Sequence, residues 1–230
     1  MKSIDPYTLE IIAEYAEDTE HELQEKIERA GRKFGQFHTT DFKERSDRMQ
    51  ALAHILEKRR EEAAMMMTRE MGKPITEARS EINKCAWVCR YYAETASEHL
   101  APEYVDTDAN RSYVSYDPLG VILAVMPWNF PFWQVFRFAA PTIMAGNTAL
   151  LKHASNVQGC AGMIEDLFTE AGFDPGVFQN LRISSEKVEH VLRNPVIKGV
   201  SLTGSGSAGS AVSKIAGSEI KPSLLELGGS

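Results

Sequence analysis

This sequence has few cysteines, no excess of basic residues and no long apolar run. Its three cysteines are an odd number without clustered histidines, which predicts neither a disulfide framework nor a zinc site, and no other metal site is predicted. We expect Cys85, Cys89 and Cys160 to be small buried side chains in a reducing compartment, with no nucleophile among them.

The charge balance and the short apolar runs exclude two classes of partner. Lys and Arg number 25 against 32 Asp and Glu, and the net charge of −7 argues against a nucleic-acid surface. The apolar stretches break well short of the roughly 20 residues that a membrane span needs, and the first residues begin no secretory signal. We therefore expect a cytoplasmic globular protein of one large or two small domains.

The first hundred residues have apolar positions at helical spacing. Asp18-Thr19 is predicted to cap the first helix, and a long helix is predicted over residues 75–99. Between Tyr104 and Tyr116, alternating residues flank a turn, which predicts a β-hairpin. An isolated hairpin is marginal in water, so we expect this one to pair with other strands.

From residue 119 onward, strand-like runs alternate with amphipathic segments. The predicted strands are 121–125, 148–152, 177–183, 199–202 and 223–227, and the predicted helices are 132–144, 158–171, 186–193 and 208–216. This alternation predicts an α/β fold, an open parallel sheet with helices on both faces. Such sheets commonly bind nucleotides.

The segment Met126-Pro127-Trp128-Asn129-Phe130-Pro131 directly follows the first apolar strand. Ligands of open α/β sheets bind at the carboxyl ends of the strands, and the two prolines stiffen this loop. The Asn129 amide donates hydrogen bonds without carrying charge, which suits it to stabilising a developing oxyanion. An equally good interpretation is that Asn129 caps the helix that follows.

Two further features lie at predicted strand ends. Glu226 ends an apolar strand, where a buried acid would suit a general base, and the alternative is an exposed strand end. The run Gly204-Ser205-Gly206-Ser207-Ala208-Gly209 follows the fourth strand. Its glycines would let the backbone approach a pyrophosphate at the start of a helix, and the alternative is a flexible loop.

Taken together, these segments resemble the aldehyde dehydrogenase superfamily. Upstream, Arg69-Glu70-Met71-Gly72-Lys73-Pro74-Ile75 resembles the family's N-terminal helical signature, and Leu151-Lys152-His153-Ala154 looks most like bacterial NAD(P)-dependent succinate-semialdehyde dehydrogenases. The other matching motifs are Pro127-Trp128-Asn129-Phe130-Pro131, Ala145-Gly146-Asn147, Leu150-Leu151-Lys152, Thr203-Gly204-Ser205 and Glu226-Leu227-Gly228-Gly229.

The resemblance implies a domain organisation and a cofactor, NADP or NAD. It implies a helical part over residues 1–99, an oligomerisation hairpin over 100–118 and a Rossmann-like NAD(P)-binding part over 119–230. Lys152 would reach the adenosine ribose or a 2′-phosphate, unless it is a solvated lysine. Ser155 stands where NAD-preferring relatives carry a glutamate, so nothing there repels a 2′-phosphate. The implied cofactor contacts are Met126, Pro127, Trp128, Lys152, Ser155, Gly204, Ser205, Gly209 and Leu227.

The resemblance also implies the catalytic and substrate residues. Asn129 would be the oxyanion donor, and Glu226 would activate the water that hydrolyses a thioacyl intermediate. Arg137, with Trp133 on roughly the same side of the helix, would bind the carboxylate of succinate semialdehyde, because a guanidinium holds a carboxylate bidentately. The alternative for Arg137 is a surface ion pair.

Family members continue past the position of Glu226 into a catalytic domain that carries the nucleophilic cysteine, and this sequence stops at Ser230. We therefore expect the N-terminal cofactor-binding part of an aldehyde dehydrogenase, inactive alone because it lacks that thiolate. The full-length form would be a homo-oligomer that oxidises succinate semialdehyde to succinate. The alternative is a truncated, non-catalytic nucleotide-binding or assembly module.

Overall fold

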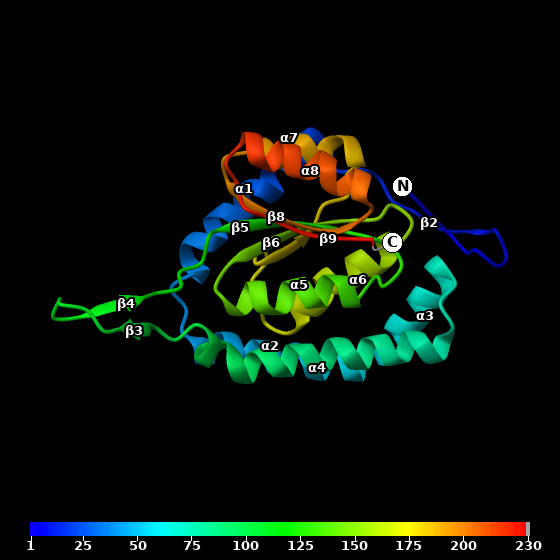
Figure 1. Cartoon of the computed structure of the whole chain (residues 1–230). Coiled ribbons are helices and arrows are strands. Elements are labelled where there is room, and N and C mark those ends of the chain that lie inside the picture. Colours follow the sequence, from blue (N-terminus) through cyan, green and yellow to red (C-terminus); the bar gives the residue numbers. More distant parts are fainter. Residues whose placement is uncertain (229–230) are drawn as a thin grey trace.

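A five-stranded parallel sheet lies at the centre of the computed structural model, which describes residues 1–228 (Figure 1). Its strands run in the order β7-β6-β5-β8-β9. Their bounds are β5 (Val121–Met126), β6 (Thr148–His153), β7 (Phe178–Asn180), β8 (Ile197–Gly204) and β9 (Ser223–Leu227). The chain moves outward from β5 to β7 and then starts again at β8 beside β5. The strand order therefore reverses between β5 and β8, the place where such sheets bind ligands.

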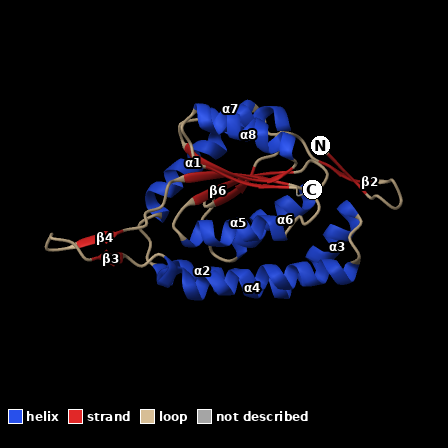
Figure 2. Cartoon of the chain, viewed as in Figure 1, coloured by secondary structure: helices blue, strands red, loops and turns tan. Residues whose placement is uncertain are grey.

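Helices cover both faces of this sheet, as Figure 2 shows. One face carries α5 (Trp133–Met144) and α6 (Gln158–Glu170), and outside them pack α2 (Phe42–Lys58), α3 (Arg60–Met71) and α4 (Ile75–His99). The other face carries α1 (Glu20–Phe37), α7 (Val188–Arg193) and α8 (Gly206–Ser218). Each face has its own apolar core, one around Phe136 and Phe168 and the other around Leu123 and Leu150. The predicted α/β fold is confirmed.

The first hundred residues do not form one helical body. The predicted cap of the first helix is confirmed, since the Thr19 side chain accepts from the Glu22 amide and the Glu22 carboxylate accepts from the Thr19 amide. However, α1 packs on β6, across the sheet from α2, α3 and α4. Sequence periodicity identified these helices but carried no signal for the face that each one covers.

Two hairpins lie outside the central layers. The predicted one is confirmed, with β3 (Glu103–Val105) antiparallel to β4 (Ser112–Val114), and it protrudes from the body of the molecule (Figure 1). A second hairpin, β1 (Lys2–Ile4) with β2 (Ile11–Glu14), was not predicted. Its strands are too short for a clear alternating pattern.

The boundaries of several elements differ from prediction. The strand predicted over 177–183 is only the short β7, and the helix predicted over 186–193 is a 3-10 turn (Ser185–Lys187) followed by α7. Helix α8 begins at Gly206, earlier than predicted, because Ser205 caps it. Within residues 1–228, no helix combines the length and apolar character needed to cross a membrane.

Candidate active site

A cavity of about 460 Å³ lies at the carboxyl ends of β5, β8 and β9. It sits where the strand order reverses, as expected for a ligand site in this kind of sheet. The β8–β9 register places Thr203 beside Glu226 and Gly204 beside Leu227, which brings two distant motifs together. Among the predicted site residues, the cavity is lined by Pro127, Trp128, Asn129, Gly204, Ser205, Glu226 and Leu227.

Asn129 lies on the wall of this cavity and is exposed. The interpretation of Asn129 as a helix cap is wrong, because Phe132 is the residue that precedes α5 and the amides at the helix start donate to Glu81. Within residues 1–228 the Asn129 side-chain amide makes no hydrogen bond to the rest of the protein. It remains available as a hydrogen-bond donor inside the cavity.

The loop that carries Asn129 is tied to β6 by His153. This histidine is fully buried, and its Nε2 lies 2.8 Å from the carbonyl oxygen of Pro131. Its Nδ1 lies 2.9 Å from the amide nitrogen of Ala154 and 3.3 Å from the carbonyl oxygen of Met126, and the two shorter contacts favour a proton on Nε2. Burial lowers the pKa of His153 to about 4, so the ring is neutral near pH 7. The predicted contact residue Met126 has a buried side chain at the start of the loop.

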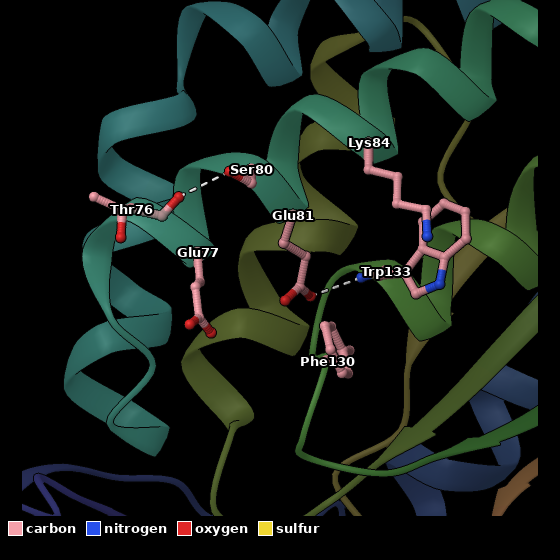
Figure 3. A pocket seen from close by; sticks show the side chains of 7 residues that line it. All are labelled: Thr76, Glu77, Ser80, Glu81, Lys84, Phe130 and Trp133. Carbon is pink, nitrogen blue, oxygen red and sulfur yellow. Dashed lines mark hydrogen bonds between the residues drawn. The ribbon is translucent and has the colours of Figure 1, made fainter.

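A buried ion pair holds the other side of this loop. The Glu81 carboxylate accepts from the backbone amides of Phe132 and Trp133, both at 2.9 Å, and so caps the start of α5 (Figure 3). Lys73 pairs with Glu81, and its Nζ lies 3.6 Å from the centre of the Phe130 ring. Both charged side chains are at most 5% exposed. Sequence reasoning missed both residues and also His153.

Arg137 and Glu226, predicted for different roles, form an ion pair with each other. Arg137 also donates a hydrogen bond to the Thr203 hydroxyl at 3.4 Å. The expectation that Glu226 ends a buried strand is wrong for the described residues, because β9 is an edge strand and the Glu226 side chain is 42% exposed. The Glu226 carboxylate is instead paired with Arg137 at a partly exposed position.

Trp133 faces a second cavity of about 380 Å³ between α4 and the loop (Figure 3). Its ring lies under the Lys84 ammonium, with Nζ 3.8 Å from the ring centre, and Phe130 lines the same space. Arg137 points instead toward Glu226 and Thr203 on the sheet. The two predicted substrate residues are therefore not brought into one cavity.

Lys152 lies near the end of β6, and the interpretation of it as a solvated lysine is wrong. It is only 8% exposed, and its Nζ donates to the Ser185 hydroxyl at 3.3 Å. Burial lowers the pKa of Lys152, and no carboxylate of residues 1–228 forms a salt bridge with it. Ser155, in the turn that follows, is exposed. A buried ammonium without a carboxylate partner is well suited to receive an anionic ligand.

The glycine- and serine-rich run forms a capped helix start and not a flexible loop. Ser205 caps α8, its hydroxyl accepting from the Ala208 amide at 3.3 Å, and Gly206 and Ser207 are exposed beside it. A Cβ on Gly209 would lie 2.5 Å from the Leu227 side chain. Gly209 thus allows α8 to approach β9 closely, but it does not line the cavity. Leu227 packs against Gly209 and also lines the cavity. Gly229, which ends the last motif, and Ser230 lie outside the described residues.

All three cysteines are buried, as expected. Burial raises the pKa of the Cys85, Cys89 and Cys160 thiols well above the ordinary range. A thiolate nucleophile needs a lowered pKa and access to substrate, so none of these three thiols is suited to that role.

Comparison with known proteins matches the whole chain to one family. The "Aldehyde dehydrogenase family" sequence profile matches residues 1–230. An NADP(+) succinate-semialdehyde dehydrogenase of Mycobacterium tuberculosis is 49% identical over 99% of this chain and 50% of that protein. An NADP(+) succinate-semialdehyde dehydrogenase of Mycobacterium avium is 47% identical over 99% of this chain and 49% of that protein.

A solved structure gives the same result. The crystal structure of succinic semialdehyde dehydrogenase from Streptococcus pyogenes in complex with NADP+ has a TM-score of 0.96 at 38% identity, over 99% of this chain and 50% of that one. The chain spans about half the length of the curated relatives it matches. The motifs, the sheet order and these similarities agree, and the chain belongs to the aldehyde dehydrogenase family.

Proposed function

We propose that this chain supplies the cofactor site and half of the active site of an NADP- or NAD-dependent succinate-semialdehyde dehydrogenase. The observation that carries the proposal is the cavity where Asn129 and Glu226 face a common space, with Arg137 paired to Glu226. The names of the mycobacterial and streptococcal relatives support the substrate and the cofactor. We use "full-length form" for this segment followed by a cysteine-bearing catalytic domain.

The chemistry of this cavity follows from its side chains. Attack of a cysteine thiolate on an aldehyde creates an oxyanion, which the uncharged Asn129 amide would stabilise by donating a hydrogen bond. The bound nicotinamide would supply the hydride acceptor. Glu226 would then take a proton from the water that hydrolyses the thioester. Arg137 would hold the substrate carboxylate through paired N–H donors.

The described residues fit a dinucleotide cofactor. The buried ammonium of Lys152 suits a ribose hydroxyl or a 2′-phosphate, and the exposed Ser155 adds no opposing negative charge. The capped start of α8 presents backbone amides near Ser205, where a phosphate would bind favourably. These groups would bind and orient the cofactor, with Trp128 and Leu227 on the cavity wall.

A second candidate function is a non-catalytic nucleotide-binding or assembly module. The hairpin β3–β4 favours assembly, because Tyr104, Tyr113 and Val114 are about half exposed or more on a protruding element. We propose that this hairpin pairs with another subunit, so that the full-length form is a homo-oligomer. Aldehyde oxidation by the full-length form would distinguish the two candidate functions, because only the enzyme would turn over an aldehyde.

The 230-residue chain is expected to bind NADP or NAD weakly without oxidising aldehydes. Lys152 and the start of α8 are present, whereas none of the three buried thiols can act as the nucleophile. Calorimetric titration and melting shifts measure binding, and absorbance of the reduced cofactor measures turnover. No heat and no melting shift at millimolar nucleotide would contradict the cofactor assignment. Steady aldehyde oxidation by this chain that Glu226→Gln abolishes would contradict the expected lack of turnover.

Replacing Ser155 with glutamate is expected to weaken binding of NADP more than binding of NAD. Like charges 4 Å apart repel by about 1 kcal/mol even in water, which predicts at least about a fivefold difference. Ser155→Gln is the matched control, since it adds the same bulk without charge. Titration of both cofactors into the full-length form gives the comparison, and equal losses for the two cofactors would refute the assignment.

A further inference from the structure

The Arg137–Glu226 ion pair joins the residue proposed to bind substrate to the residue proposed to act as base. The pair engages one Glu226 oxygen and holds the carboxylate against the guanidinium. The Arg137 nitrogen in that contact is not free to hold a substrate carboxylate. The two proposed roles therefore compete for one contact as long as the pair is closed.

We propose that the carboxylate tail of the substrate displaces Glu226 from Arg137, and that this exchange frees the base only when a charged tail is bound. The inference rests on the proposed function. Arg137 and Glu226 are 35% and 42% exposed, and ion pairs that are this exposed contribute little to stability. Because one carboxylate replaces another, the guanidinium stays paired throughout and the exchange costs little free energy.

The surroundings of the pair allow Glu226 to move while Arg137 stays in place. Arg137 has a second anchor, its hydrogen bond to the Thr203 hydroxyl on β8. Glu226 lies on the edge strand β9 and lines the same cavity as Asn129. A released Glu226 carboxylate would remain in the cavity where the Asn129 amide marks the position of the reacting carbonyl.

The exchange predicts that acyl groups with a carboxylate tail are favoured at the hydrolysis step as well as at binding. In that step a water oxygen forms a bond to the thioester carbon, the carbon–sulfur bond breaks, and Glu226 accepts the water proton before it passes to the departing thiolate. An acyl group without a carboxylate leaves Glu226 paired and is hydrolysed slowly. A substrate with a charged tail is hydrolysed quickly because it frees the base.

Ester hydrolysis by the full-length form, without cofactor, tests this inference directly. With p-nitrophenyl acetate, the initial burst reports acylation of the cysteine and the steady rate reports thioester hydrolysis. Added propionate acts as a separate charged tail, and propionamide is the uncharged control. We expect propionate to raise the steady rate several-fold, to saturation, without changing the burst, and we expect propionamide to have no effect.

Arg137→Met supplies the second measurement. Because Arg137→Met leaves Glu226 without this partner, we expect the steady rate of the variant to equal that of the propionate-activated parent. Added propionate should not change the steady rate of the variant. An unchanged or lowered steady rate in the parent with propionate would overturn the inference while leaving the proposed function intact. A parent that releases no p-nitrophenol, in the burst or in the steady state, would refute the proposed function, and this inference with it.

Discussion

Replacing Arg137 with alanine in the full-length form is expected to raise the KM for succinate semialdehyde by roughly 10- to 100-fold. The estimate follows because a hydrogen bond to a charged group contributes about 1.5–3 kcal/mol, and only the charged tail loses its partner. Butanal, an uncharged aldehyde of the same chain length, is expected to keep its KM nearly unchanged. Steady-state kinetics with the two aldehydes measure the difference.

Arg137→Lys is the control that separates charge from geometry. Lysine keeps the positive charge but loses the planar pair of donors, so its KM should lie between those of the parent and of Arg137→Ala. A matched loss for succinate semialdehyde and butanal would assign Arg137 to folding. A fall in melting temperature would accompany that outcome, since Arg137 also contacts Thr203 and Glu226.

The parallel sheet could be predicted because its signals are local. Strand β5 is a short apolar run that ends in a proline-containing loop, and β9 was predicted with its observed bounds. The same local logic identified the cap at Thr19 and the hairpin near Tyr104. The carboxyl ends of the predicted strands were therefore enough to predict that Asn129, Ser205 and Glu226 lie near one another, and all three line one cavity.

The groups that fix the loop could not be predicted, because their partners are far away in the sequence. Glu81 caps a helix that begins about 50 residues later, and His153 bonds to the carbonyl of Pro131, 22 residues earlier. Neither pairing produces a periodic or compositional pattern. The one available signal was a charged or polar side chain on an otherwise buried face, as at Glu81 and His153, which indicates a partner without naming it.

The edge position of β9 was also not predicted from the sequence. The apolar run of β9 predicted a buried strand, but in residues 1–228 this strand pairs only with β8, so Leu224 is 62% exposed and Glu226 is paired where burial was expected. Periodicity similarly placed Trp133 and Arg137 on one helix face. Their neighbours differ, because Trp133 faces the cavity beside α4 whereas Arg137 contacts Thr203 and Glu226 on the sheet.

Replacing Asn129 with alanine in the full-length form is expected to lower kcat by about 10²- to 10³-fold, the usual cost of losing one oxyanion donor. Because the amide acts only when the oxyanion develops, the KM and the affinity for cofactor should change little. Rapid kinetics should show a loss in acylation by aldehyde. Cofactor titration of the same variant should match the parent.

The structure explains why this change should act on chemistry and not on folding. The loop around Asn129 is fixed by His153 on one side and by the Lys73–Glu81 pair on the other, and none of these contacts uses the Asn129 side chain. The melting temperature of Asn129→Ala should therefore equal that of the parent. Asn129→Asp, of nearly the same shape, should be at least as slow, because a carboxylate repels the oxyanion that the amide stabilises. Near-parental kcat in both variants would place the oxyanion donor elsewhere.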